Sequence, residues 1–208
     1  MPRFSSSLVE AGVVIPVRSF TRGKSRLAGA FGVGAVGRTA NEAFVRGLAA
    51  RAVDAAIPHP TAVVTSAPEV VEWARERGVF VVPDAGSLDA AANAGRSWVA
   101  ARGLARVVVV HADLPDIVSL DSVAGDGAEP VAVIAPCHRG DGSPVLSVPV
   151  SAEFTFSYGP GSFARHCAEA RRVGLELRIV HDDALGFDVD GPDDLAAFLA
   201  RRPVAPDR

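Results

Sequence analysis

The sequence predicts a single α/β domain with a mainly parallel central sheet and helices on both faces. A length of 208 residues fits one domain. Apolar runs alternate with Ala-rich helical stretches through residues 13–111, and this β-α-β-α-β order is typical of parallel sheets. The run Val107–Val110 is continuously apolar, as expected for a strand that is buried on both faces. We expect the domain to span residues 1–202 and residues 203–208 to form a frayed tail.

Strands are expected where apolar, β-branched residues cluster between turn residues. In chain order they are Val13–Val17, Thr61–Thr65, Val79–Val82, Arg106–His111, Val131–Ala135, Val145–Val148 and Leu175–Val180, with a short extended piece at Phe187–Val189. Helices are expected where apolar residues recur near a period of 3.6. They are Gly37–Ala56, Glu69–Arg77, Leu88–Gly103, Ser162–Gly174 and Pro192–Ala200.

Local signals support several of these helix ends. Gly78 follows the second helix and Gly103 closes the third, as glycine commonly does. Pro192 suits a first helical turn, where its missing N–H costs nothing. Asp193 and Asp194 would then lie at the positive end of the helix dipole, so helix-start acids explain them.

Composition and charge narrow the class of protein. The net charge is −3, with 49% hydrophobic and 22% charged residues, as in ordinary globular proteins. No apolar run is long enough to span a bilayer, and residues 1–10 lack the apolar segment of a secretion signal. Cys137 and Cys167 are too few and too far apart for a disulfide framework or a zinc motif. We therefore expect a cytoplasmic protein that binds neither membranes nor nucleic acid.

A basic loop follows the first expected strand. Four cations, Arg18, Arg22, Lys24 and Arg26, fall within nine residues of an otherwise acidic chain. Ligands of α/β proteins bind at the carboxyl edge of the sheet, and the following helix would add its N-terminal N–H groups. The loop therefore predicts a receptor for a small anion such as a phosphate.

Two acidic positions could hold a metal. Asp113 lies just beyond the four-valine strand, where it could ligate a divalent cation or cap the following turn. Asp188 and Asp190 point the same way if their segment is extended. Two neighbouring carboxylates resist joint ionisation unless a cation is near, so a metal site is one solution. Asp190 could instead be an N-cap of the last helix, which leaves Asp188 as the better ligand candidate.

Two glycine-rich stretches carry polar groups. In Tyr158–His166 a turn opens onto a helix, and Ser162 could bind an anion or serve as an N-cap. Arg165 and His166 could lie near that anion or on the helix surface. In Gly140–Pro144, Ser143 adds a donor beside glycines that permit close approach of a ligand, although an ordinary hairpin turn has the same composition.

Cations for a polyphosphate and two carboxylates for Mg²⁺ together suit nucleotidyl transfer. That chemistry depends on positioning and charge neutralisation, so it needs no side-chain nucleophile.

The order of these motifs resembles the CofC/FbiD family over nearly the whole chain. That family comprises the 2-phospho-L-lactate and phosphoenolpyruvate guanylyltransferases of deazaflavin coenzyme biosynthesis. The segments that carry the resemblance are residues 17–27, Asp113-Leu114-Pro115, Gly140-Asp141-Gly142-Ser143, residues 156–166 and Asp188-Val189-Asp190. The resemblance implies the single-domain glycosyltransferase-A-like fold of the MobA-like nucleotidyltransferases, a Mg²⁺ cofactor and a homodimer.

The resemblance also implies roles for individual residues. An acceptor phosphate oxygen would attack the α-phosphorus of GTP, and pyrophosphate would leave. Lys24, Arg26 and Asp113 would be the catalytic residues. The binding residues would be Lys24 and Arg26 for the triphosphate, Asp113 and Asp188 for Mg²⁺, and Ser143, Gly159 and Ser162 for the phosphate and carboxylate of a three-carbon acceptor.

Three departures from the family pattern bear on substrate choice. Arg18 stands where the family has a lysine near the acceptor, and a planar guanidinium does not replace an ammonium neutrally. Asp89 stands where the family has an asparagine near the nucleotide. Gly140-Asp141-Gly142-Ser143 replaces a Gly-Thr-Gly-Thr loop. Alternatives are therefore another acceptor, such as 3-phosphoglycerate or a sugar phosphate, another nucleotide, or a degenerate protein that binds nucleotide without turnover.

Overall fold

The computed structural model describes residues 10–22, 24, 27, 30–32, 34–84, 86–125 and 127–201. Arg26 and the expected tail at residues 203–208 lie outside these residues. The strands are β1 Ala11–Pro16, β2 Thr61–Val64, β3 Phe80–Val82, β4 Arg106–Val110, β5 Val131–Ala135, β6 Val145–Pro149 and β7 Glu176–Ile179. The helices are α1 Gly34–Ala55, α2 Pro68–Glu76, α3 Leu88–Ala100, α4 Asp121–Ala124, α5 Ser162–Arg172, α6 Asp183–Gly186 and α7 Pro192–Arg201.

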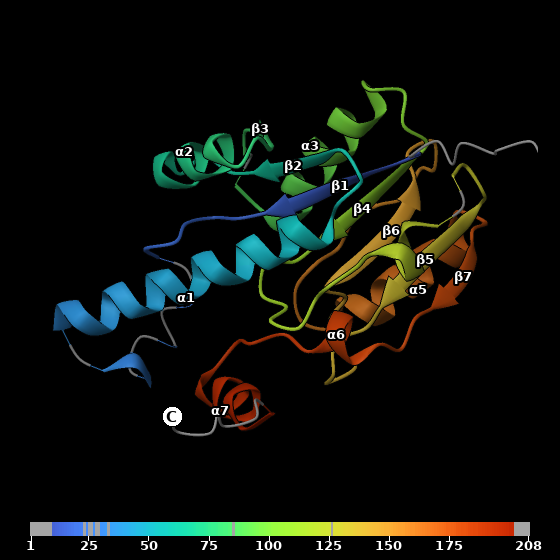
Figure 1. Cartoon of the computed structure of the whole chain (residues 1–208). Helices are drawn as coiled ribbons and strands as arrows, with labels where there is room; N and C mark the ends of the chain where they lie inside the picture. The colour runs from blue at the N-terminus through green and yellow to red at the C-terminus, as the bar shows by residue number, and fades with distance from the viewer. Residues whose placement is uncertain are drawn as a thin grey trace, which may run out of the picture.

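The strands form one seven-stranded sheet in the order β3-β2-β1-β4-β6-β5-β7. β1 pairs in parallel with β2 and β4, β2 with β3, and β5 with β7 (Figure 1). Only β6 runs antiparallel to both of its neighbours, β4 and β5. The predicted α/β class with a mainly parallel sheet is confirmed, and the expected hairpin connects β5 to β6.

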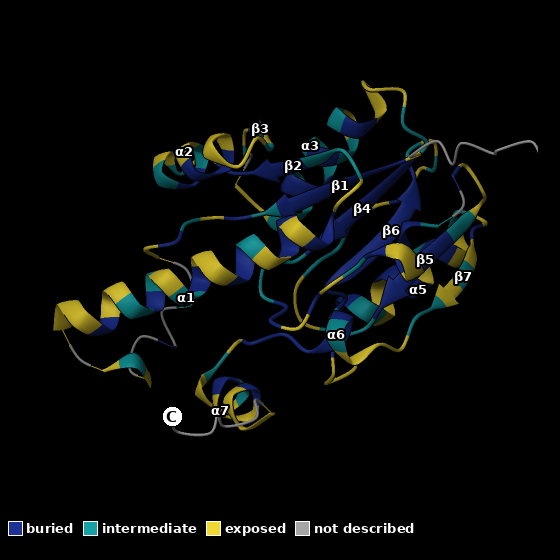
Figure 2. Cartoon of the chain, in the orientation of Figure 1, coloured by how far each residue is buried: buried dark blue, intermediate teal, exposed yellow. Residues whose placement is uncertain are grey.

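Helices cover both faces of the sheet, as predicted. Val13 and Val14 are adjacent in β1 but belong to two different apolar clusters, because successive side chains of a strand point to opposite faces. The Val13 cluster includes residues of α1, α2 and α4, and the Val14 cluster includes residues of α3 and α5. In Figure 2 the central strands are accordingly buried, whereas the helices and the edge strand β7 show exposed residues.

The structure differs from the sequence prediction mainly in short elements. The four-residue helices α4 and α6 were not expected, because a single turn carries no periodic signal. The piece at Phe187–Val189 was expected to be extended, and Phe187 is extended although the segment pairs with no strand. Its apolar side chains pack against α7 in a third cluster, which consists of Leu27, Phe187, Val189, Leu195 and Phe198 with Phe31 and Phe44 beside them.

This third cluster positions the acids that follow Phe187. Val189 donates its backbone N–H to the carbonyl oxygen of Asp113 over 3.1 Å, so the segment lies directly against the end of β4.

Among the described residues, no helix is both long enough and apolar enough to cross a membrane.

Helix α3 approaches β1 closely at Gly95. A Cβ at that position would lie 2.7 Å from Val14 Cγ2, and even closer to Val14 Cγ1. Gly47 in α1 is the opposite case, since it is exposed and a Cβ there meets nothing within 4 Å.

We expect Gly95→Ala to destabilise the protein by ~1–3 kcal/mol, because overpacking outweighs the gain in helix propensity. Gly47→Ala is the matched control and should stabilise by ~0.5–1 kcal/mol, since only the propensity changes. Urea unfolding of both variants measures the two free energies. If both substitutions changed the free energy of unfolding in the same direction, the result would contradict the close approach of α3 to β1.

Candidate active site

Three adjoining hollows line the edge of the sheet at which β1 and β4 end. The basic hollow, of about 720 Å³, is lined by Arg18, Arg22 and Lys24 together with residues that follow β2 and β3. The serine hollow, of about 420 Å³, is lined by Ser143 and Ser162 among others. A junction hollow of about 410 Å³ shares Arg18 and Lys24 with the basic hollow. It also shares Leu88, His111 and Asp113 with the serine hollow, so the three form one continuous groove.

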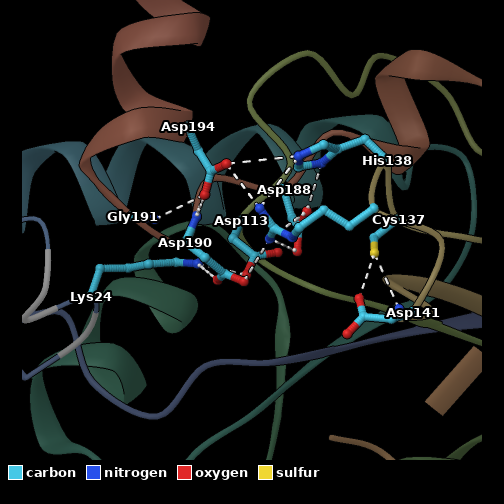
Figure 3. A network of polar contacts seen from close by, with 11 residues as sticks. Lys24, Asp113, Cys137, His138, Asp141, Asp188, Asp190, Gly191 and Asp194 are labelled. Carbon is cyan, nitrogen blue, oxygen red and sulfur yellow. Dashed lines mark hydrogen bonds and ion pairs between the residues drawn. The ribbon is translucent and has the colours of Figure 1, made fainter. Parts of the chain in front are cut away.

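Lys24 occupies the middle of this groove. Its ammonium lies 2.8 Å from Asp113 Oδ2 and 2.7 Å from Asp190 Oδ1 (Figure 3). Burial alone would lower the pKa of Lys24, but the two carboxylates raise it above its ordinary value, so the side chain stays charged. Its φ of 52° is left-handed, and no other non-glycine residue in the described part of the chain shares that conformation. Such a backbone costs about 1–3 kcal/mol and is characteristic of functional sites.

Asp113, Asp188 and Asp190 form an acidic cluster in this groove. Arg139, from the β5–β6 loop, lies on the side of this cluster away from Lys24. Its Nη2 lies 3.3 Å from both carboxylate oxygens of Asp188 and 3.1 Å from Asp190 Oδ2. Its Nη1 donates to Asp194 Oδ1 over 2.9 Å. Sequence reasoning missed this residue, although a cation beside a glycine-rich loop is a usable signal for anion binding. His138 Nδ1 also lies 3.1 Å from Asp188 Oδ1 (Figure 3).

The pKa values of Asp188 and Asp190 are shifted in opposite directions. Burial, together with the charges of Asp113 and Asp190, raises the pKa of Asp188 to about 6. Burial would also raise the pKa of Asp190, but Lys24 and Arg139 outweigh it and the pKa is lowered. Burial and neighbouring negative charge therefore both oppose the ionisation of Asp188 at this edge.

The structure distinguishes the alternatives for the other acids. Asp113 Oδ2 contacts Lys24, and Asp113 Oδ1 is buried with no hydrogen-bond partner among the described residues, so Asp113 is not a turn cap. Asp194 Oδ2 accepts the N–H groups of Asp190 and Gly191 at 2.9 and 3.0 Å, which is the helix-start role expected for it. The Asp190 carboxylate faces the cations instead.

The serine hollow is backed by a chain of buried polar groups. Ser143 Oγ donates to Ser162 Oγ over 3.2 Å and lies 2.8 Å from His166 Nδ1. The backbone N–H of Ser157 donates to His166 Nε2 over 2.9 Å. His166 is fully buried rather than on the helix surface, and burial lowers its pKa to about 4. Gly161 is the N-cap of α5, which leaves Ser162 in the first helical position rather than as a cap.

Side chains hold the glycine-rich loop at residues 157–161 in place. Arg165 donates to the carbonyl oxygens of Ser157 and Pro160 at 3.0 and 2.6 Å, among others. The Asp89 carboxylate accepts the Tyr158 N–H over 2.6 Å. Gly159, with a φ of 101°, lines the serine hollow between these anchors. Arg165 therefore supports the loop from outside the hollow.

Most of the residues predicted from sequence meet at this groove. The set that lines the serine hollow is Asp113, Ser143, Gly159, Ser162 and Asp188, and Lys24 reaches Asp113 from the basic hollow. Arg18 does not join the serines: it lines the basic and junction hollows and donates to the Gly86 carbonyl over 2.9 Å. Arg22 is exposed.

Comparisons with known proteins find similar sequences and similar folds. Residues 11–201 match a family model described as "Guanylyl transferase CofC like". A phosphoenolpyruvate guanylyltransferase of Rubrobacter xylanophilus is 33% identical over 193 residues, which cover 90% of this chain and 92% of that protein. A structure from Desulfovibrio desulfuricans G20, assigned as a nucleotide-diphospho-sugar transferase, superposes with a TM-score of 0.72 at 16% identity, over 92% of this chain and 87% of that one. CMP:2-keto-3-deoxy-manno-octonic acid synthetase, solved with CTP, gives a TM-score of 0.58 at 15% identity over 92% and 97%.

Asp188→Asn should stabilise the metal-free protein at neutral pH. The pKa of Asp188 is raised from 3.8 to about 6, so the cost of ionising this group is fully present above pH 6 and disappears below pH 4. We expect a gain of about 1 kcal/mol at pH 7.5, or ~2–4 °C in Tm, which shrinks to nothing at pH 4. Thermal unfolding in EDTA measures it, with exposed Asp193→Asn as the control. A lower Tm at pH 7.5 would mean that the contacts with Arg139 outweigh the crowding of charge.

Proposed function

The chain belongs to the CofC-like guanylyltransferase family and is a nucleotidyltransferase; from this premise we propose that it joins the GMP unit of GTP to a small phosphorylated carboxylic acid. The acceptor we propose is phosphoenolpyruvate or 2-phospho-L-lactate, with release of pyrophosphate in deazaflavin coenzyme biosynthesis. Its relative in Rubrobacter xylanophilus carries the name phosphoenolpyruvate guanylyltransferase.

One observation carries the proposal. The ammonium of Lys24 bridges Asp113 and Asp190 at the point where the basic hollow meets the serine hollow. A nucleotidyl transfer needs two anionic substrates that approach one another end to end, with fixed cations and carboxylates between them. The nucleotide would lie in the basic and junction hollows and the acceptor in the serine hollow, so their reacting groups would meet beside Lys24.

The reaction requires no deprotonation by the protein. A phosphate monoester is largely dianionic at pH 7, so its oxygen is already a nucleophile. As the acceptor oxygen bonds to the α-phosphorus, the bond from that phosphorus to the bridging oxygen breaks, and pyrophosphate leaves with the electron pair. Lys24 and Arg26 would neutralise the triphosphate, and Ser143, Gly159 and Ser162 would orient the acceptor.

The acidic cluster suits a Mg²⁺ ion that is shared with substrate phosphates. Asp113 Oδ1 is buried without a hydrogen-bond partner among the described residues, and burial together with the charges of Asp113 and Asp190 raises the pKa of Asp188. In the described part of the chain, no group of three or more His, Cys, Asp and Glu side chains could hold a metal ion. Mg²⁺ commonly takes one or two carboxylates plus phosphate oxygens, so Asp113 and Asp188 would hold it and it would neutralise phosphate charge.

We expect pyrophosphate release from GTP with phosphoenolpyruvate or 2-phospho-L-lactate in the presence of Mg²⁺, and its loss in EDTA. Asp113→Asn and Asp188→Asn should each lower kcat/KM by at least ~10³-fold, because charge neutralisation is the main catalytic contribution. A coupled pyrophosphate assay measures the rates, and mass spectrometry identifies the guanylylated product. GTP, CTP, UTP and ATP are each tested against both acids and 3-phosphoglycerate.

Asp193→Asn is the matched control, since Asp193 is an exposed acid at the start of α7 and should leave the rate unchanged. Turnover that survives either of the other two substitutions would contradict the metal assignment. No turnover for any pair of substrates would favour a protein that binds nucleotide without catalysis.

A further inference from the structure

Behind the serine hollow, the hydrogen bonds that link Ser157, His166, Ser143 and Ser162 all donate in one direction. His166 Nε2 accepts the N–H of Ser157 at 2.9 Å, and a backbone N–H can only donate. Nε2 therefore carries no hydrogen, and the proton of the neutral ring lies on Nδ1. That proton points to Ser143 Oγ, 2.8 Å away, so Ser143 accepts from His166.

The direction continues to the edge of the hollow. Ser143 accepts from His166, so its own hydroxyl proton is free for the 3.2 Å bond that it donates to Ser162 Oγ. Ser162 accepts that bond, and its remaining hydroxyl proton is available to the serine hollow, which it lines. The opposite polarity would place a proton on His166 Nε2, where it would face the Ser157 N–H donor.

We propose that His166 is a positioning residue that fixes the Ser162 hydroxyl as a hydrogen-bond donor to the acceptor anion. The identity of that anion rests on the proposed function. His166 is 0% exposed, so it acts through Ser143 and Ser162 rather than by contact with the ligand. The hollow is thereby selective for an ionised phosphate or carboxylate, which only accepts hydrogen bonds. A ligand that presents a donor at this point would meet a second donor and bind poorly.

Burial supports the neutral ring on which this direction depends. The groups that face His166 include Asp89, Arg165, His111 and Glu169, and burial outweighs them in lowering its pKa to about 4. Ser143 and Ser162 are 1% and 2% exposed, so water does not compete freely for these bonds. The same geometry would also suit a histidine that merely fills the core, and the experiments separate the two roles.

The first test needs no turnover. ¹⁵N-edited NMR of the histidine rings should show His166 as the Nδ1–H tautomer at pH 7. The signals of its ring are identified among the five histidines by their loss in His166→Gln. An Nε2–H tautomer or a charged ring would overturn the proposal, whether or not the wild type is active.

The second test uses a matched pair of substitutions. The short amide of asparagine can reach only the Nδ1 position and so can still donate to Ser143. Glutamine reaches the Nε2 position and keeps the bond to Ser157 but not the one to Ser143. We expect His166→Gln to raise the KM for phosphoenolpyruvate by ~10-fold or more, with the KM for GTP within ~2-fold, and His166→Asn to stay within ~3-fold of wild type for both.

A third variant shows whether His166 acts through Ser162. In a Ser162→Ala background, His166→Gln should have no further effect on the KM for phosphoenolpyruvate. A core-filling role predicts instead that the two His166 variants lower Tm and shift both KM values alike, which would overturn the proposal. If wild type turns over no acceptor, the proposed function fails, and the tautomer measurement still decides the direction of the chain.

Discussion

The crowding of Asp113, Asp188 and Asp190 at one sheet edge is the constraint that organises this protein. Lys24 and Arg139, which come from loops far apart in sequence, contact these carboxylates. Burial, together with the charges of Asp113 and Asp190, raises the pKa of Asp188 to about 6. The β1–α1 loop, the β5–β6 hairpin and the segment before α7 each contribute charged side chains to this cluster.

Sheet topology explains how such distant residues meet. The parallel strands β1 and β4 end at this edge, so the loops that follow them place Lys24 and Asp113 there. The antiparallel strand β6 begins there, which delivers Ser143. Asp188 arrives by a different route, since its segment belongs to no strand and is held by the third apolar cluster and by the bond from Val189 to Asp113.

The sequence predicted what depends on pattern and order along the chain. The apolar runs identified the parallel sheet, and the position of Asp113 after a buried strand identified its edge. Pairings between distant residues could not be predicted, because spacing carries no information about them. Arg139 beside Asp188, and Asp89 beneath Tyr158, are contacts of this kind. The surface or buried position of His166 depended on how α5 packs against residues 154–158, which helical periodicity alone does not determine.

The hairpin between β5 and β6 keeps its backbone path through main-chain hydrogen bonds. Its tip is fixed by main-chain hydrogen bonds, from His138 N–H to the Gly186 carbonyl and from Phe163 N–H to the Asp141 carbonyl. Such bonds do not depend on side-chain identity, so side chains at the tip can diverge while the backbone path is kept. The backbone path of residues 136–144 would therefore survive a change of side chain at an exposed position such as Asp141.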